Sequence, residues 1–81
     1  MKVVYRIDIM KSLRMVGWTT KKLREKKILG EATMQRLRHN LPVSFDVLAK
    51  LCYLLGCDIS DILIYIGDKY EPQSSLNKKE D

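Results

Sequence analysis

The segment from residue 19 to residue 40, TTKKLREKKILGEATMQRLRHN, constrains this chain more than any other feature, because it predicts two short helices around a tight turn. The first helix is expected from about Thr20 to Lys27, after an N-cap at Thr19 or Thr20. The second is expected over residues 31–39. Between them, Ile28-Leu29-Gly30 is too short to form an element and predicts the turn, where Gly30 can take conformations that a side chain resists.

The second of these helices has two chemically different faces. Met34 and Leu37 share one face, which predicts packing against the rest of the fold, and Leu23 anchors the first helix in the same way. Another face carries Ala32, Thr33 and Arg36. A helix with one packed face and one free face, preceded by a basic helix, can lie against a DNA duplex.

Three further helices are predicted from apolar periodicity. One runs from Tyr5 to Val16 and stops at Gly17. A wide apolar stripe follows the cap residue Ser44 and continues to Gly56, so it is expected to form the centre of the core. A short fifth helix is expected from Ile59 or Ser60 to Ile66. The sequence therefore predicts an all-α fold, a compact bundle of five helices.

The length of 81 residues is that of a single domain with a small core. A chain of this size buries only about 60% of the surface that it exposes when unfolded. We expect residues 1–67 to form the domain, and residues 68–81, which lack hydrophobic periodicity, to form a flexible polar tail.

The net charge of +5 is unevenly distributed along the chain. Residues 1–27 hold nine Lys and Arg against Asp8 and Glu25, which gives +7, whereas residues 28–66 and 67–81 each sum to −1. A positive first third is typical of a surface that meets phosphates. A solvated lysine-rich helix face would give the same pattern, so charge alone leaves both interpretations open.

Other classes of protein are disfavoured. No apolar stretch approaches the roughly 18 residues that span a bilayer, and Arg6 and Asp8 interrupt the N-terminal window of a signal peptide, so we expect a soluble cytoplasmic protein. Cys52 and Cys57 form neither a CxxC pair nor a set with a second Cys/His pair. We therefore expect no zinc and no disulfide, and both thiols to fill apolar space in a reducing compartment.

No enzyme is expected either. The lone His39 has no nucleophile to activate, so a surface or helix-capping role is expected for it. Three acids stand at helix starts, where capping explains them: Asp46, Asp58 and Asp61. Because no Gly-rich phosphate loop or paired catalytic carboxylate appears, no cofactor is predicted.

The order of Leu23, a turn at residues 28–30, Thr33-Met34 and Leu37 before a leucine-rich helix resembles the phage-repressor type helix-turn-helix family, also called Cro/cI or XRE. The resemblance runs from Thr19 to Leu63, and CYLLGCDISDILIYI is its most recognisable part. It implies a five-helix lambda-repressor-like DNA-binding domain that acts as a transcriptional regulator. Two positions depart from the family pattern: its turn glycine corresponds to Ile28, and its Ser or Thr cap on the third helix corresponds to Gly30.

The resemblance also assigns roles to individual positions. Residues 31–39 would lie in the major groove of double-stranded DNA, with four residues facing base edges: Glu31, Ala32, Thr33 and Arg36. Thr20 and the stretch from Asn40 to Ser44 match positions that contact the phosphate backbone. The predicted backbone contacts are Thr20, Lys21, Lys22, Arg38, Asn40 and Ser44. Lys26 and Lys27 are also expected to act through phosphates, with some of the four lysines pointing away from a bound duplex.

The chemistry of these side chains gives expectations of its own. Arg36 can donate two hydrogen bonds to guanine O6 and N7, worth about 1–3 kcal/mol of discrimination, or it can bind a phosphate or stay solvated. Thr33 can offer its methyl group to thymine and its hydroxyl group to a base or phosphate. Glu31 can accept from cytosine N4, or it can serve only as the negative charge that suits a helix N-terminus. Gln35 can read adenine or brace the neighbouring helix.

Partners follow from the size of the domain. Helix-turn-helix proteins commonly pair on two half-sites, so we expect a homodimer. Ile64 and Tyr65 point away from the apolar face of the predicted fifth helix and are the candidate interface, with residues 3–5 beside them. Alternatively, the N-terminus or the Lys69-Tyr70 tail covers this surface. A second function remains open: a protein-interaction module, such as an antitoxin-like or accessory factor, on the same fold.

Overall fold

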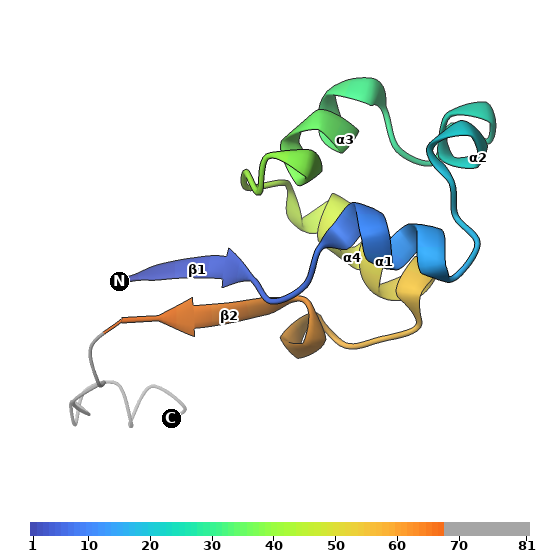
Figure 1. The fold of residues 1–81 in the computed structure, drawn as a ribbon. Coiled ribbons are helices and arrows are strands. Elements are labelled where there is room, and N and C mark those ends of the chain that lie inside the picture. Colours follow the sequence, from blue (N-terminus) through green and yellow to red (C-terminus); the bar gives the residue numbers. More distant parts are fainter. Residues whose placement is uncertain (68–81) are drawn as a thin grey trace, which may run out of the picture.

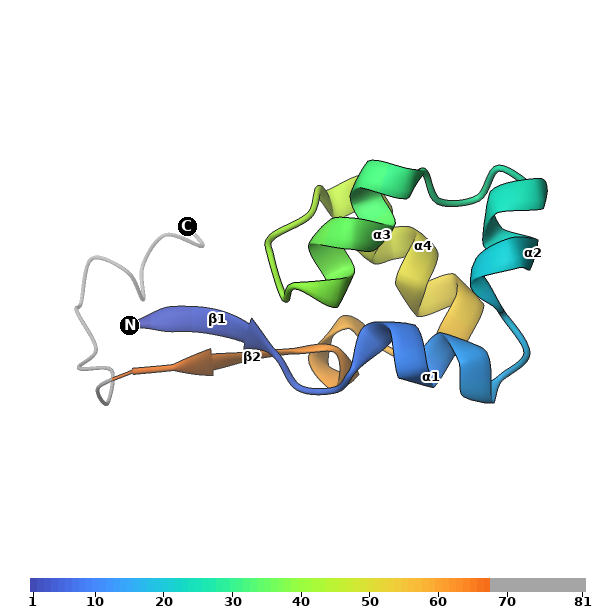
Figure 2. The same ribbon diagram turned by 45° about the horizontal axis from the view of Figure 1, so that its top comes forward.

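The computed structural model describes residues 1–67, which form four α-helices, one 3₁₀ turn and a two-stranded sheet. The elements follow the order β1 (Lys2–Tyr5), α1 (Ile9–Met15), α2 (Thr20–Glu25), α3 (Glu31–Arg38), α4 (Phe45–Leu55), η1 (Ile59–Asp61) and β2 (Leu63–Ile66). The helices form one body, and the two strands project from it as a ribbon (Figures 1 and 2). The tail predicted for residues 68–81 lies outside the described residues.

Side-chain caps fix where three of the helices begin. The Asp8 carboxylate accepts the backbone N–H of Lys11 at 3.1 Å and starts α1. The hydroxyl groups of Thr19 and Ser44 accept backbone N–H groups at 3.2 Å each, at the starts of α2 and α4. The prediction that the first helix begins at Tyr5 was wrong, because residues 2–5 form a strand and Asp8 caps the helix behind it.

The core lies where α4 meets the other helices and the segment before β2. Its buried side chains come from every helix: Ile9, Met10, Leu13, Leu23, Leu29, Met34, Leu37, Leu48, Leu51 and Ile62. Leu51, near the middle of α4, is 0% exposed. The prediction that the α4 stripe forms the centre of the core is confirmed.

The predicted fifth helix is wrong, and with it the purely all-α class. The segment instead forms the short η1 turn, capped by Asp58, and then β2. β2 pairs antiparallel with β1, with Tyr65 opposite Val3 and Ile64 opposite Val4. A short run of β-branched residues suits a strand as well as a helix, and the partner strand, some 60 positions away in the sequence, decides between them.

The ribbon is tied to the helices at its base. The backbone N–H of Arg6 donates to the carbonyl of Ile62 at 2.7 Å, and its guanidinium donates to the carbonyl of Ser60 at 3.1 Å. The Tyr5 hydroxyl donates to the carbonyl of Leu41 at 2.6 Å. The Arg6 bonds join the two ends of the described chain to each other, and the Tyr5 bond joins β1 to the loop that follows α3.

Within residues 1–67, no helix has the length and apolar character needed to cross a membrane, and no three metal-ligating side chains cluster. Cys52 and Cys57 are free thiols that pack against the core. Burial raises the pKa of the Cys57 thiol, and Cys52 and the acids Asp61 and Asp58 raise it further. Cys57 therefore stays protonated at neutral pH.

Candidate nucleic-acid interface

The turn between α2 and α3 is closed by backbone hydrogen bonds. The N–H of Ile28 donates to the carbonyl of Leu23 at 2.9 Å, and the N–H of Lys27 donates to the carbonyl of Arg24 at 3.1 Å. This pattern requires a left-handed residue just past the helix end, and Lys27 takes that conformation, with φ of 55°. Gly30 was expected to take a conformation that a side chain resists, but it is extended, with φ of −76°, and serves as the N-cap of α3. The turn exists as predicted, but its left-handed residue lies three positions earlier.

We expect Gly30→Ser to raise the free energy of unfolding by about 0.5–1 kcal/mol, because serine adds the N-cap bond that α3 lacks and leaves the unfolded chain with less conformational entropy to lose on folding. No atom lies within 4 Å of a Cβ built at Gly30. Gly56→Ser is the matched control: it has equal space, but its φ is +66°, so it should lower stability by about 1 kcal/mol. Urea unfolding of both variants measures this, and equal effects at the two sites would contradict it.

The two faces predicted for α3 are present. Met34 and Leu37 are buried, while Ala32 and Arg36 are exposed and Thr33 is half-buried. Asn40 follows the end of α3 in the left-handed conformation, at φ 58°, which asparagine tolerates better than most residues. The packed face thus holds α3 on the core and leaves its other face on the surface.

Arg36 is the most precisely positioned side chain on that face. Its Nε donates to the carbonyl of Pro42 at 2.7 Å, which ties α3 to the loop before α4. Among the described residues, its two terminal nitrogens make no hydrogen bond, so both can donate to another molecule. Arg36 lines a hollow of about 410 Å³ together with Thr33, Pro42, Val43, Ser44 and Val47. The fold therefore brings together Thr33, Arg36 and Ser44, three of the residues predicted to contact DNA.

Tyr5 is a residue of this region that sequence reasoning missed as part of the site. Its hydroxyl holds the carbonyl of Leu41, next to the Pro42 carbonyl that binds Arg36. Burial raises the pKa of Tyr5 above its ordinary 10.0, and the positive charge of Arg36 lowers it in part. The hydroxyl is thus a stable donor at neutral pH. No local pattern in the sequence signals this contact, because 36 residues separate the partners.

Glu31 is engaged within the protein. Its Oε1 accepts from Arg24 Nε at 3.2 Å and from Nη2 at 3.0 Å, and its Oε2 lies 3.9 Å from Arg38. All three side chains are substantially exposed, so these pairs contribute only about 0–1 kcal/mol to stability. Their effect is positional, because they order Arg24 and Arg38 beside the first turn of α3. Oε2 accepts no hydrogen bond from the described residues, so a contact from Glu31 to cytosine can use this oxygen while Oε1 keeps Arg24.

The residues predicted to contact the DNA backbone surround α3. Thr20 is the first residue of α2 and is half-buried, and Lys21 lies 4.0 Å from Glu25 in an exposed pair. Ser44 accepts the N–H of Val47, so its hydroxyl proton can still be donated to a phosphate. Thr19 has the same arrangement at the start of α2. It is a second candidate hydroxyl, one that the sequence reading assigned only to capping.

Comparison with known families gives one match. The model of the Cro/C1-type HTH DNA-binding domain matches residues 8–68, which is most of the chain. Comparison with curated proteins and with solved structures gave no significant match. The matched range includes all four helices, the turn between α2 and α3, and the loop that Arg36 binds. The chain therefore belongs to the Cro/C1-type family of helix-turn-helix DNA-binding transcriptional regulators.

Proposed function

We propose that this regulator recognises a specific sequence of double-stranded DNA by laying α3 in the major groove, with residues 1–67 as the binding unit. Base edges are contacted by Ala32, Thr33 and Arg36, and by Glu31 through Oε2 while Oε1 keeps Arg24. The observation that carries the proposal is the fixed guanidinium of Arg36, whose two terminal nitrogens have no partner among residues 1–67 and which shares a hollow with Thr33 and Ser44. That is the arrangement needed for a bidentate contact to guanine.

The phosphate backbone is contacted on both sides of α3. Thr20, Lys21 and Lys22 lie at the start of α2, while Asn40 and Ser44 frame the loop after α3. Arg38, at the end of α3, adds a further charge. These contacts give affinity and register, and the base contacts give sequence preference. The function requires no cofactor or catalytic group, and it is carried out in the cytoplasm.

Duplexes enriched from a randomised library test this function directly. Fluorescence anisotropy would compare the enriched duplex with an unrelated duplex of equal length. The proposal predicts a preference of about 10³-fold or more at physiological salt. If the folded protein binds both duplexes equally, or neither, sequence-specific recognition is wrong and the protein-interaction function takes its place.

We expect Lys22→Gln to weaken binding to every duplex and to reduce the slope of log K against log salt by about 0.9, the value for one neutralised phosphate. Lys22 is exposed on the first turn of α2. Lys11→Gln is the matched control, since Lys11 lies on α1, outside the proposed surface. Anisotropy titrations across a salt series measure both slopes. Equal slopes for the two variants would show that Lys22 binds no phosphate.

We also propose a homodimer formed through β2. One edge of β2 pairs with β1, and the other edge has no strand beside it within residues 1–67. Ile64 and Tyr65 are 39% and 52% exposed on this strand. Two copies related by a two-fold axis can join their β2 edges into a four-stranded antiparallel sheet, which would hold two α3 helices for two half-sites.

Tyr65→Lys is expected to shift the dimer towards monomer, because a lysine on an edge strand opposes strand-to-strand association. Tyr53→Lys is the matched control: Tyr53 is 85% exposed on α4, away from the sheet, and its replacement should leave the dimer intact. Sedimentation equilibrium of both variants measures the association. A wild-type protein that stays monomeric at high concentration would contradict the dimer.

A further inference from the structure

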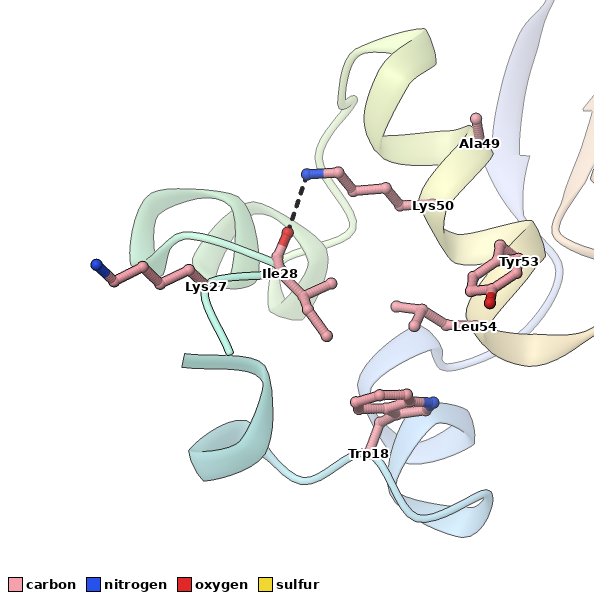
Figure 3. Close-up of a pocket in the computed structure, with 7 residues that line it drawn as sticks. All are labelled: Trp18, Lys27, Ile28, Ala49, Lys50, Tyr53 and Leu54. Atoms are coloured by element: carbon pink, nitrogen blue, oxygen red, sulfur yellow. Dashed lines mark hydrogen bonds between the residues drawn. The ribbon is translucent and has the colours of Figure 1, made fainter. Parts of the chain in front are cut away.

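A second surface remains unexplained by DNA binding. It is a groove of about 630 Å³ lined by Trp18, Lys27, Ile28, Ala49, Lys50, Tyr53 and Leu54, and we call it the Trp18 groove (Figure 3). It lies between α4, the turn before α3 and the link from α1 to α2. Apart from Lys27, for which the sequence left a phosphate contact open, none of its residues is a predicted DNA contact. The regulator can therefore use this groove while α3 is occupied.

The Trp18 groove is an apolar surface with no partner in the described chain. The side chains of Trp18, Ile28 and Leu54 face a common space, and the ring of Tyr53 lies at its margin (Figure 3). Tyr53 is 85% exposed, and Phe45, two helical turns earlier on α4, is 87% exposed. An exposed aromatic side chain at the margin of an apolar hollow, such as Tyr53, marks an interaction site.

The charge around the groove selects the partner. Among the residues that the structure describes, Lys27 and Lys50 are the only charged ones that line it, and none of the lining side chains is acidic. Lys50 donates to the carbonyl of Ile28 at 3.0 Å, which brings its ammonium group to the groove rim and leaves further N–H donors free. A ligand that fills the groove is therefore favoured if it carries apolar anchors flanked by carboxylates.

A second copy of this chain fits poorly. A symmetric contact of groove with groove would set Lys27 and Lys50 against the same lysines, and each chain carries a net charge of +5. A duplex also fits poorly, because phosphates gain nothing from an aromatic and aliphatic lining. We propose that the Trp18 groove binds an acidic amphipathic helix of a different protein, with apolar residues at i, i+3 or i+4, and i+7 in the groove and carboxylates at Lys27 and Lys50. Recruitment of that protein to DNA rests on the proposed function; the helix–groove contact itself does not.

Trp18 is the only tryptophan of the chain, so its fluorescence reports directly on the groove. The probe is a 16-residue helical peptide, about four turns long. It is made of Leu and Glu, with Leu at helical spacing, and contains no aromatic residue. We expect saturable binding with a blue shift of Trp18 emission. The same peptide with Lys in place of every Glu should cause no shift. Equal responses to the two peptides, or no response to either, would overturn the proposal.

Variants locate the contact. The double variant Lys27→Glu, Lys50→Glu should lower the affinity for the acidic peptide by about tenfold, and so should the single variant Tyr53→Ala. Lys11→Glu, a charge reversal on α1, should leave peptide affinity unchanged, and the same loss in this control would refute groove binding. Tyr53→Ala should bind DNA like the wild type. If the wild-type protein binds the acidic peptide but no DNA, the groove proposal stands and only the proposed function fails.

Discussion

Arg36→Ala is expected to lower the preference for the enriched duplex by about 1–3 kcal/mol, while binding to unrelated duplexes falls only slightly. The reason is geometric. The Pro42 carbonyl holds Nε, and the two terminal nitrogens form a planar pair with no partner among the described residues, which matches the two acceptors of guanine in the major groove. Competition anisotropy with the two duplexes measures the change in preference.

Two further variants make this result specific. Arg36→Lys keeps the charge but loses the planar pair of donors, so it should restore general binding and not the preference. Arg38→Ala removes an arginine that is already engaged by Gln35 and Glu31, and it should weaken all duplexes alike. If Arg38→Ala lowers the preference as much as Arg36→Ala does, Arg36 is not the residue that reads the base.

The part of the fold that could be predicted from sequence is the part with local signals. α2 and α4 follow cap residues, Thr19 and Ser44, whose hydroxyl groups bind backbone N–H groups three residues ahead. α3 follows from the spacing of Met34 and Leu37, which places both on the buried face. In each case a few consecutive residues determine the structure, so a single sequence is sufficient.

The sheet could not be predicted in this way. Residues 63–66 are consistent with a helix or a strand, and the choice depends on pairing with residues 2–5 at the other end of the described chain. The left-handed conformation of Lys27 was missed for a related reason: the hydrogen bonds that close α2 determine which residue adopts it, whatever its propensity. Sequence reasoning also named Arg36 for DNA contact, but its bond to Pro42 depends on how the loop folds back on α3.

Leu51→Ala is expected to lower the free energy of unfolding by about 2–5 kcal/mol, the largest effect on stability among the substitutions considered. Leu51 is 0% exposed at the centre of the core, so alanine would leave a cavity that the surrounding helices cannot fill. A small domain is stable by only about 5–15 kcal/mol, so much of its stability would be lost. Leu41→Ala, at a residue 43% exposed, is the matched control and should cost under about 1 kcal/mol.

Urea unfolding followed by Trp18 emission measures both losses, and equal costs at the two leucines would contradict the central position of Leu51. Added duplex distinguishes the loss of stability in Leu51→Ala from the loss of a base contact in Arg36→Ala. A duplex that binds only the folded protein adds about 2.7 kcal/mol of stability at a concentration 100 times its Kd. Leu51→Ala should therefore refold and recover its sequence preference as duplex is added. Arg36→Ala should be folded throughout and should not recover the preference at any concentration, because it lacks the contact and not the fold.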